Sequence, residues 1–509
     1  MTNTDSYPFE GLFTFEMANN HQGDVAHGKR IVREFATIAK KHGVHASVKL
    51  QLRDLNTFIH KDFLEDKTNK HIPRFLSTKL SKTEFQELVD EMRAQKLAVE
   101  ATPFDERSVA FAEELGVEVL KVASCSARDW PLLEAIANAD KPTIISTGGL
   151  ALDDIDKLVS FFEHRYVDFA LMHCVAIYPT TPEKLQLHQI RLLKERYPHL
   201  TIGFSTHEEP DNYEAVQLAY AMGARMFERH VGIVTDKITL NAYSSTPEQV
   251  EKWLVSYKRA VAMCGTEGER VTDAGEEKDL LPLMRGAYVK RDVGKGEELS
   301  ADDVFFAFPI QEGQLSSGEF RAGMTADKNY KKRAPLAGSL KETIPTRQGH
   351  IIYPIIHEVK GMLRYARVPV DLNADVELSH HYGVERFREV GVTIIDCINR
   401  EYCKKILVQL PGQTHPHHHH KKKEEAFQML WGELQIELDG RVRTLYPGDV
   451  VVVQRGMRHA FWTMTGAIFE EVSTTHYNDD SIYRDKTINI LPREARKTKL
   501  YNWGRFQFD

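Results

Sequence analysis

The chain has 509 residues, 42% of them hydrophobic, and a formal net charge of −7. Its length predicts roughly two to four domains with well-buried cores. The negative charge argues against general affinity for nucleic acid or anionic membranes, so neither is expected as a partner. A local basic pocket that binds an acidic substrate is still compatible with this negative net charge.

The cysteines and the N-terminal residues indicate the cellular compartment of the protein. Five cysteines without a CxxC pair suit a reducing compartment rather than a disulfide framework. The opening MTNTDSYPFEG lacks the basic start and apolar core of a secretory signal. No apolar run approaches the roughly 20 residues of a membrane span. We therefore expect a cytoplasmic protein.

Eight short apolar stretches alternate with amphipathic stretches of helical length in the first 235 residues. They are Leu12–Asn19, Ala46–Leu52, Ala98–Phe104, Val119–Ser124, Pro142–Thr147, Phe169–His173, Thr201–His207 and Met226–His230. This alternation predicts an α/β fold, a (β/α)8 TIM barrel over residues 8–275, with a last helix over Thr246–Cys264 and a linker over Gly265–Asp279. Such barrels carry their active site at the C-terminal ends of the strands, here called the mouth.

Polar residues on these stretches predict an anion pocket at the mouth. Lys49 and Lys121 lie mid-strand, where a charge is costly unless it is paired or faces a polar interior. Gln51 lies on the same strand as Lys49. Hydroxyl groups from other strands complete the pocket: Thr102, Ser124, Ser146 and Ser205. A ligand with a phosphate and a carboxylate would match these groups.

Two histidines predict a metal site beside that pocket. His207 and His230 end neighbouring strands, so their imidazoles could share one divalent ion, with water or substrate completing its coordination. Glu16 is a candidate general base or orienter of metal-bound water. A single strand-end histidine is more often structural, and a single lysine can extend its charged end to solvent. The combination at one end of the barrel favours the functional interpretation.

Two further domains follow the barrel. Arg285–Phe308, with a glycine-punctuated turn over Asp292–Ser300, and Ala334–Thr343 predict a small β domain at residues 283–347. From about Val376, β-rich segments recur between glycines, which predicts an antiparallel barrel or jelly roll over residues 360–480. Residues 481–509 form a charged tail with several aromatic residues.

A histidine cluster in the third domain predicts a second metal site. His418 and His420 alternate along a strand and so point to one side. Glu425 follows, and His459 returns on a later strand after the turn at Gly448. Three histidines and one glutamate with open positions suit Mn, Fe, Ni or Zn. His415 and His417 would then be the outer, solvated part of the loop.

The barrel resembles the sialic acid (N-acetylneuraminate) synthase family over roughly residues 8–345. The strings that carry the resemblance are Glu16-Met-Ala-Asn-Asn-His21, Val48-Lys-Leu-Gln51, Ala101-Thr-Pro-Phe-Asp105, Leu120-Lys-Val-Ala-Ser124, Ile145-Ser-Thr-Gly148, His173-Cys174 with Tyr178-Pro179, Gly203-Phe-Ser-Thr-His207 and Glu228-Arg-His230. Val289–Glu297 resembles the antifreeze-like (SAF) domain of that family.

The third domain resembles a cupin in the spacing of both metal motifs, with Gln454 where proline is usual. Its string His418-x-His-Lys-Lys-Lys-Glu-Glu425 is also similar to sugar-isomerase cupins related to lyxose isomerase.

The family resemblance implies an activity and residue roles. It implies the condensation of phosphoenolpyruvate with an aldehyde sugar: the enolate carbon attacks the aldehyde, water attacks C2, and phosphate leaves. Lys49, Thr102, Lys121, Ser124 and Ser205 would hold phosphoenolpyruvate. His207 and His230 would bind a divalent ion, typically manganese, near Glu16. It also implies a homodimer.

Three departures from the family lie mostly on the sugar side. Ser126 stands where the family has a glutamate, and Ala176 where it has an asparagine. The arginine that the family lends to the N-acyl group of the sugar across a dimer aligns near Phe308. We infer a different sugar without the N-acetyl group; the competing inference is a weakened or lost synthase activity.

Three hypotheses follow from the sequence. The first is an enzyme that joins phosphoenolpyruvate to an aldose and gives a 3-deoxy-2-ulosonic acid, with a cupin that binds or isomerises the sugar. The second is an isomerase or epimerase in which only the cupin is active. The third is a non-catalytic sugar-sensing scaffold.

Overall fold

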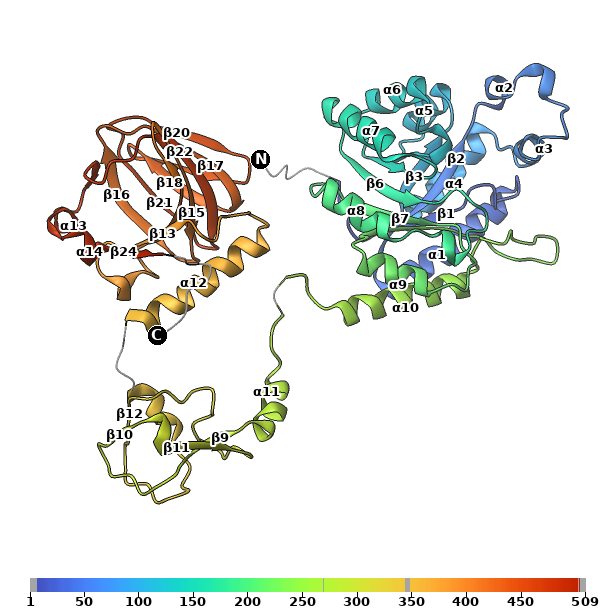
Figure 1. The fold of residues 1–509 in the computed structure, drawn as a ribbon. Coiled ribbons are helices and arrows are strands. Elements are labelled where there is room, and N and C mark those ends of the chain that lie inside the picture. Colours follow the sequence, from blue (N-terminus) through green and yellow to red (C-terminus); the bar gives the residue numbers. More distant parts are fainter. Residues whose placement is uncertain (1–6, 269, 344–347, 502, 504–509) are drawn as a thin grey trace. The chain divides into compact units, whose positions relative to one another are not determined.

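The computed structural model of the protein describes residues 7–268, 270–343, 348–501 and 503. They belong to two compact units, Met1–Arg270 and Val271–Asp509, drawn as ribbons in Figure 1. Parts of the predicted opening segment (residues 1–6), small β domain (344–347) and tail (502 and 504–509) lie outside the described residues. Among the described residues, no helix combines the length and the apolar character that crossing a membrane requires.

The first unit is the predicted barrel. Within residues 7–268, eight parallel strands close in chain order, and β1 completes the ring by pairing with β8. The strands are β1 (Leu12–Glu16), β2 (His45–Leu52), β3 (Ala98–Pro103), β4 (Val119–Val122), β5 (Thr143–Ser146), β6 (Phe169–Cys174), β7 (Ile202–Thr206) and β8 (Met226–His230). The α/β barrel fold is thus confirmed.

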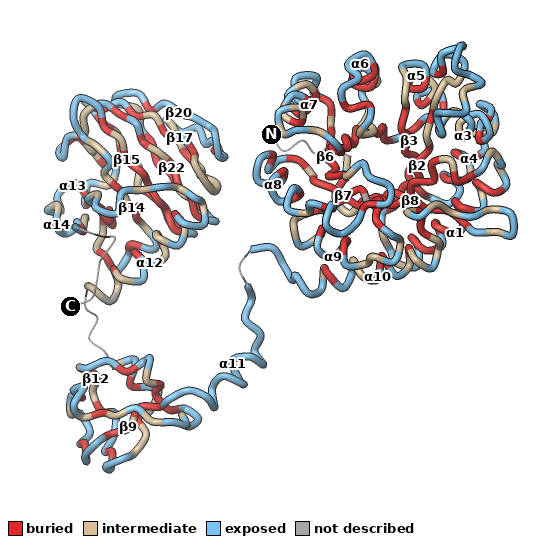
Figure 2. Tube along the Cα trace, turned by 45° about the vertical axis from the view of Figure 1, so that its right-hand side comes forward, coloured by how far each residue is buried: buried red, intermediate tan, exposed pale blue. Residues whose placement is uncertain are grey.

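Amphipathic helices surround the barrel (Figure 1). They are α1 (Val25–His42), α4 (Lys82–Ala94), α5 (Glu106–Glu114), α6 (Trp130–Asn138), α7 (Leu152–His164), α8 (His188–Arg196), α9 (Glu214–Ala221) and α10 (Pro247–Cys264). Their ends follow local chemistry: α1 starts where Asp24 accepts two backbone N–H groups and ends at Gly43 in the left-handed conformation. The apolar faces pack on the strands, and Figure 2 shows the buried residues following the barrel wall.

The connection from β2 to α4 is long and adds α2 (Leu55–Phe58) and α3 (His71–Ser77). Its side chains line the cavity at the barrel mouth, among them Phe58, Arg74 and Phe75. We call residues 55–77 the mouth loop. The loop matters for function because it adds aromatic and basic groups to a mouth otherwise built from strand ends.

The second unit begins with α11 (Ala274–Leu280) and a small β domain. Its strands are β9 (Gly286–Val289), β10 (Glu298–Leu299), β11 (Val304–Ala307) and β12 (Met324–Thr325). β9 pairs with β11 and β10 with β12, both antiparallel, around a core that includes Val289, Leu299 and Met324.

The rest of the second unit has the antiparallel sheets expected of a cupin. Its elements are α12 (Gln348–Tyr365), β13 (Asp375–Ser379), β14 (Val392–Asn399), β15 (Tyr402–Gln409), β16 (Thr414–His420), β17 (Glu425–Gly432), β18 (Leu434–Leu438), β19 (Arg441–Leu445), β20 (Val450–Val453), β21 (His459–Trp462), β22 (Ala467–Thr474), β23 (Ser481–Tyr483), α13 (Lys486–Ile490), α14 (Arg493–Arg496) and β24 (Lys497–Leu500). Within residues 348–501, one sheet has the order β20-β17-β22-β15-β14-β13-β24 and the other β19-β18-β21-β16-β23. Aromatic residues such as Phe427, Phe461 and Phe469 contact one another in the core.

Segments at both ends of the cupin complete it. Ile355 and Val359 of α12 belong to the same apolar cluster as Val376 and Leu378 of β13. The last strand, β24, pairs with β13, and Lys497 of β24 forms a 2.5 Å ion pair with Glu377. The expected tail therefore supplies β23 and β24 to the two sheets.

A glycine in this domain allows a test of the packing. Gly432 has φ +83°, and a Cβ there would lie 2.1 Å from the carbonyl oxygen of Gly466. We expect Gly432→Ala to lower the melting temperature of the cupin markedly, because strain in the left-handed region of about 1–2 kcal/mol adds to a backbone clash.

Gly440 is the matched control for this experiment. It has a similar φ of +85°, but a Cβ there would meet nothing within 4 Å. Gly440→Ala should lower the melting temperature less, since only the conformational strain applies. Equal shifts in calorimetry of the two full-length variants would contradict the close approach of Gly432 and Gly466.

Candidate active site and metal centre

The barrel mouth holds a cavity of about 1140 Å³. All of the predicted barrel residues line it: Glu16, Lys49, Gln51, Thr102, Lys121, Ser124, Ser146, Ser205, His207 and His230. The register of the parallel strands explains this convergence, because Glu16 lies level with Lys49 of β2 and with His230 of β8. Residues far apart in sequence therefore meet at one level of the barrel.

Two buried ammonium groups share one carboxylate at the base of this cavity. Glu228 Oε2 lies 2.6 Å from both Lys49 Nζ and Lys121 Nζ. Lys49 Nζ also lies 2.9 Å from Glu16 Oε2 and 3.9 Å from Glu100 Oε1. We call these five residues the charge cluster.

Burial and ion pairing shift the pKa values of the charge cluster in opposite directions. Burial alone would lower the pKa of Lys49, but the carboxylates of Glu16, Glu228 and Glu100 outweigh it and raise that pKa. Burial alone would raise the pKa of Glu228, but the two lysines outweigh it and lower that pKa.

For the other members of the charge cluster, burial prevails. It raises the pKa of Glu16 and Glu100 and lowers that of Lys121. The firmest charges are therefore Lys49 and Glu228, and an anionic ligand would favour the protonated form of Lys121.

Glu100 and Glu228 are members that the sequence predictions missed. Glu100 is held by hydroxyl donors, Thr14 Oγ1 at 2.8 Å and Ser47 Oγ at 2.9 Å. Glu228 Oε1 accepts a hydrogen bond from Ser205 Oγ at 3.2 Å. The sequence contained the information needed to find both glutamates. Each is a charged residue within a buried strand, which is the pattern that singled out Lys49 and Lys121.

The two imidazoles lie together at the rim of the same cavity. The ring centroids of His207 and His230 are 5.3 Å apart, and Tyr178 and Tyr243 contact them. His207 Nδ1 lies 3.1 Å from the carbonyl oxygen of Val175. Because a carbonyl oxygen can only accept a hydrogen bond, Nδ1 carries the proton and Nε2 bears the lone pair. Burial lowers the pKa of His207 to about 3 and of His230 to about 4, so both rings are neutral at neutral pH.

A divalent ion fits this pair, because two neutral imidazoles offer nitrogen lone pairs beside a polar cavity. Among the described residues, the three-ligand group of His, Cys, Asp or Glu side chains lies in the cupin and not here. An ion in the barrel would therefore have two protein donors and take water or substrate as further ligands.

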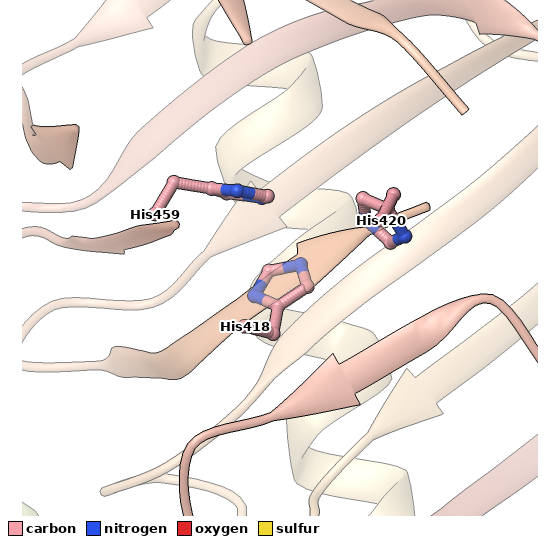
Figure 3. Close-up of side chains that lie close together, drawn as sticks. All are labelled: His418, His420 and His459. Atoms are coloured by element: carbon pink, nitrogen blue, oxygen red, sulfur yellow. The ribbon is translucent and has the colours of Figure 1, made fainter. Parts of the chain in front are cut away.

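The cupin holds a more complete cage. His418, His420 and His459 are buried, and their ligand atoms lie within 4.8 Å of one another (Figure 3). The first two come from β16 and the third from β21, which pair so that His418 lies opposite His459. The side chain of Glu425 joins them, with Oε1 3.4 Å from His420 Nε2 and Oε2 3.3 Å from His459 Nε2.

The hydrogen bonds of the three imidazoles fix which nitrogen faces the centre. Their Nδ1 atoms lie 3.0, 3.2 and 3.2 Å from the carbonyl oxygens of Pro416, Asp480 and Met457. Carbonyl oxygens only accept, so each Nδ1 carries a proton and each Nε2 presents a lone pair. Three lone pairs and an ionised carboxylate form the donor set of a divalent transition metal, and a bound cation would favour the ionised form of Glu425.

Lys423 and Glu471 extend this cage, and the sequence predictions did not include them. Lys423 Nζ contacts Glu425 closely and lies 2.9 Å from Glu471 Oε1. Burial raises the pKa of Glu425 to about 7, although the ammonium of Lys423 opposes this. His415, expected as an outer loop residue, is instead buried and stacked on Phe461. That expectation is wrong because His415 points inward with His418.

Comparison with known proteins identifies the first unit. The NeuB family model matches residues 35–269. An uncharacterized protein of Methanocaldococcus jannaschii is 31% identical over 312 residues, which cover 60% of this chain and 88% of that protein. The chain belongs to the NeuB family. The cupin domain model matches residues 406–470.

Two further relatives of this NeuB family chain are informative. The crystal structure of a candidate spore coat polysaccharide biosynthesis protein E from Chromobacterium violaceum is 44% identical, with a TM-score of 0.63, and the match covers 65% of this chain and 99% of that one. The N,N'-diacetyllegionaminic acid synthase of Campylobacter jejuni is 25% identical over 337 residues, 63% of this chain and 97% of that enzyme.

The positions at which this NeuB chain departs from the expected pattern have different surroundings. Ala176 lines the mouth cavity, so a methyl group stands there in place of an amide. Ser126 is buried just after β4. Phe308 is 62% exposed on the small β domain.

The charge cluster predicts the effect of removing its shared carboxylate. Glu228→Gln leaves two buried ammonium groups without their common partner, so we expect the barrel to lose about 3–5 kcal/mol of stability. Glu87→Gln is the control, since Glu87 pairs with Lys29 at 2.6 Å on the surface and such pairs contribute up to about 1 kcal/mol. Calorimetric transitions that shift equally in both variants would count against the cluster.

Metal content tests the cupin cage. We expect purified protein to retain a divalent transition metal through gel filtration, and His459→Ala to lose it, because one of four donors is removed. His476→Ala is the control, since His476 lines the same small cavity outside the cage. Elemental analysis that finds equal metal in the wild type and in His459→Ala would refute this ligand assignment.

Proposed function

We propose that the barrel joins phosphoenolpyruvate to an aldose and releases a 3-deoxy-2-ulosonic acid and phosphate. The observation that carries this proposal is one cavity of about 1140 Å³ that is lined by Glu16, Lys49, Lys121 and Glu228 of the charge cluster and by two neutral imidazoles. Membership of the NeuB family supports it, since a relative such as the Campylobacter enzyme is named as an acid synthase of this type.

The cavity would hold phosphoenolpyruvate by charge and by hydroxyl groups. Lys49 and Lys121 provide two ammonium groups for its phosphate and carboxylate. Hydroxyl and amide groups around them complete the binding site: Gln51, Thr102, Ser124, Ser146 and Ser205. Fixed donors in a buried site stabilise developing charge more than water does, which is the main source of rate in such reactions.

His207 and His230 would hold a divalent ion, with manganese proposed. The ion would supply Lewis-acid activation of the sugar aldehyde. C3 of phosphoenolpyruvate forms the new bond to the aldehyde carbon, and the aldehyde oxygen takes up a proton to become a hydroxyl. Water then adds to C2, and the C2–O bond to phosphate breaks.

Glu16 is the proposed acceptor of the proton that this water releases. Burial raises the pKa of its carboxyl above the ordinary value, which suits a group that gains and loses a proton. Its Oε1 accepts the backbone N–H of Ala18 at 2.7 Å, so the carboxyl is held in place beside Lys49.

The cupin is proposed to bind a divalent transition metal (Mn, Fe, Ni or Zn) and to bind or isomerise the sugar. Its cavity of about 40 Å³ accommodates an ion and roughly two waters, at 10–15 Å³ for each water. A whole sugar therefore requires the cavity to open. This favours the barrel over the cupin as the main catalytic site.

The domain assignments are part of the proposal. They are a barrel at residues 8–275, an antifreeze-like domain at 283–347 and a cupin at 360–480, to whose sheets the tail at 481–509 adds β23 and β24. We also propose a homodimer, as the family resemblance implies, in a cytoplasmic enzyme.

Phosphate release tests the synthase. With phosphoenolpyruvate, Mn²⁺ and a panel of aldoses and ketoses, we expect release with at least one sugar. His230→Ala should reduce it at least 100-fold, because metal activation of the aldehyde is lost, while the cupin keeps its metal. No release with any sugar would remove the synthase proposal.

The same variants separate the competing functions. Ketose turnover that survives His207→Ala but not His459→Ala would indicate an isomerase whose active site is the cupin. Tight sugar binding without turnover, with both metal sites filled, would indicate a sensing scaffold.

A further inference from the structure

One guanidinium at the barrel mouth is held between aromatic rings. Arg53 Cζ lies 3.6 Å from the ring centroid of Phe104 and 4.1 Å from that of Phe75, with Phe58 at 5.8 Å. Phe58 and Phe75 belong to the mouth loop, and Phe104 directly follows β3. Rings at these distances restrict the movement of the guanidinium and interact favourably with its charge.

This cation has hydrogen-bond partners but no counter-ion among the described residues. Its two terminal nitrogens donate to the same acceptor, Gln51 Oε1, each at 3.1 Å. Its Nε is enclosed and has no hydrogen-bond partner among the described residues. Burial lowers the pKa of Arg53 to about 10, so the group remains charged at neutral pH.

Two carboxylates influence Arg53 beside the thiol of Cys125, and both have other partners. Glu16 pairs with Lys49 at 2.9 Å. Asp105 accepts backbone N–H groups from Asp54 at 2.9 Å and from Ser108 at 2.8 Å. A partly buried cation without a paired anion is costly, so the site is built to receive an anion from a ligand.

Its position along the strand shows which part of a ligand it would meet. Lys49, Gln51 and Arg53 alternate along β2 and its continuation, and all three line the cavity. At about 3.3 Å for each of four residues, the Cα of Arg53 lies about 13 Å along the chain from that of Lys49, and its guanidinium lies beside the side chain of Gln51. A sugar chain would lie between a phosphoenolpyruvate held at Lys49 and an anion held at Arg53.

Other side chains at the entrance of the cavity are also positively charged. Lys70 and Arg74 of the mouth loop line the cavity, and Arg128 does so while paired with Asp154 at 2.7 Å. Asp66 is the acidic residue that the mouth loop adds to this lining. The cationic groups outnumber it, so the entrance attracts anions.

We propose that Arg53 binds an anionic group at the far end of the acceptor sugar, so that the substrate is an acidic aldose carrying a phosphate ester or a carboxylate. This inference rests on the proposed condensation and specifies its substrate class. The guanidinium edge matches both anions, since it donates two parallel hydrogen bonds to either.

Pairs of neutral and acidic sugars test whether the substrate is anionic and whether its charge comes from a phosphate or a carboxylate. Phosphate release from phosphoenolpyruvate is measured with Mn²⁺ and D-mannose, D-mannose 6-phosphate or D-mannuronate, and with pentoses as free sugars and terminal phosphates. We expect kcat/KM at least tenfold higher for the acidic members. The phosphate and carboxylate arms then distinguish the two anions. Neutral sugars that react as well as their acidic counterparts would overturn the inference but leave the synthase in place.

Variants assign that preference to Arg53. Arg53→Met keeps bulk beside the rings and removes the charge, so KM for the acidic sugar should rise roughly 10- to 100-fold, a larger rise than for the neutral sugar. Arg53→Lys should restore part of the loss, because it keeps the charge but not the fork. Arg30→Gln, at an exposed arginine of α1, is the control. An equal loss for acidic and neutral sugars would show that Arg53 only supports the mouth loop.

A binding measurement separates this inference from the synthase proposal. Calorimetric titration of the Mn²⁺-loaded full chain with each sugar, in the presence of phosphoenolpyruvate, should show tighter binding of the acidic sugars and loss of that preference in Arg53→Met. Preference without turnover would support the Arg53 site and reject the condensation. Turnover without a preference for acidic sugars would support the condensation and reject the Arg53 site.

Discussion

The barrel depends on the compensation of charge around Lys49. An ammonium group in a closed parallel barrel is tolerated because carboxylates from β1, β3 and β8 surround it, at 2.9 Å for Glu16, 3.9 Å for Glu100 and 2.6 Å for Glu228. Those contacts require the four neighbouring strands β8, β1, β2 and β3 to be in register. The same requirement that specifies the barrel therefore places a charged pocket at its base.

Both candidate metal sites follow one further rule. In each, a backbone carbonyl accepts the Nδ1 proton of a histidine and so fixes the nitrogen that faces the cavity, as Val175 does for His207 and Met457 for His459. The backbone, whose path is set by packing, thereby prepares the lone pairs. A metal ion would then complete an arrangement that the fold has already oriented.

Much of this could be predicted from the sequence, for identifiable reasons. The eight alternations gave the barrel, and the strand ends gave the residues that converge on its cavity, since parallel strands present their C-termini at one end. Glu100, Glu228 and Lys423 were missed because their importance lies in pairing across strands, which depends on register rather than on spacing. β23 and β24 were missed because their partners, β16 and β13, lie far away in sequence. Arg53 was missed because two of the aromatic rings beside it, Phe58 and Phe75, come from a loop without a periodic pattern.

The difference in the number of protein donors at the two centres has a consequence for metal exchange. The barrel offers two imidazoles at a cavity of about 1140 Å³, whereas the cupin offers three imidazoles and the carboxylate of Glu425 at a cavity of about 40 Å³. Chelation by four donors slows dissociation far more than chelation by two. An ion in the barrel would therefore equilibrate with the free divalent pool of the surroundings, and catalysis would follow ion availability. The ion in the cupin would stay with the polypeptide from folding onward.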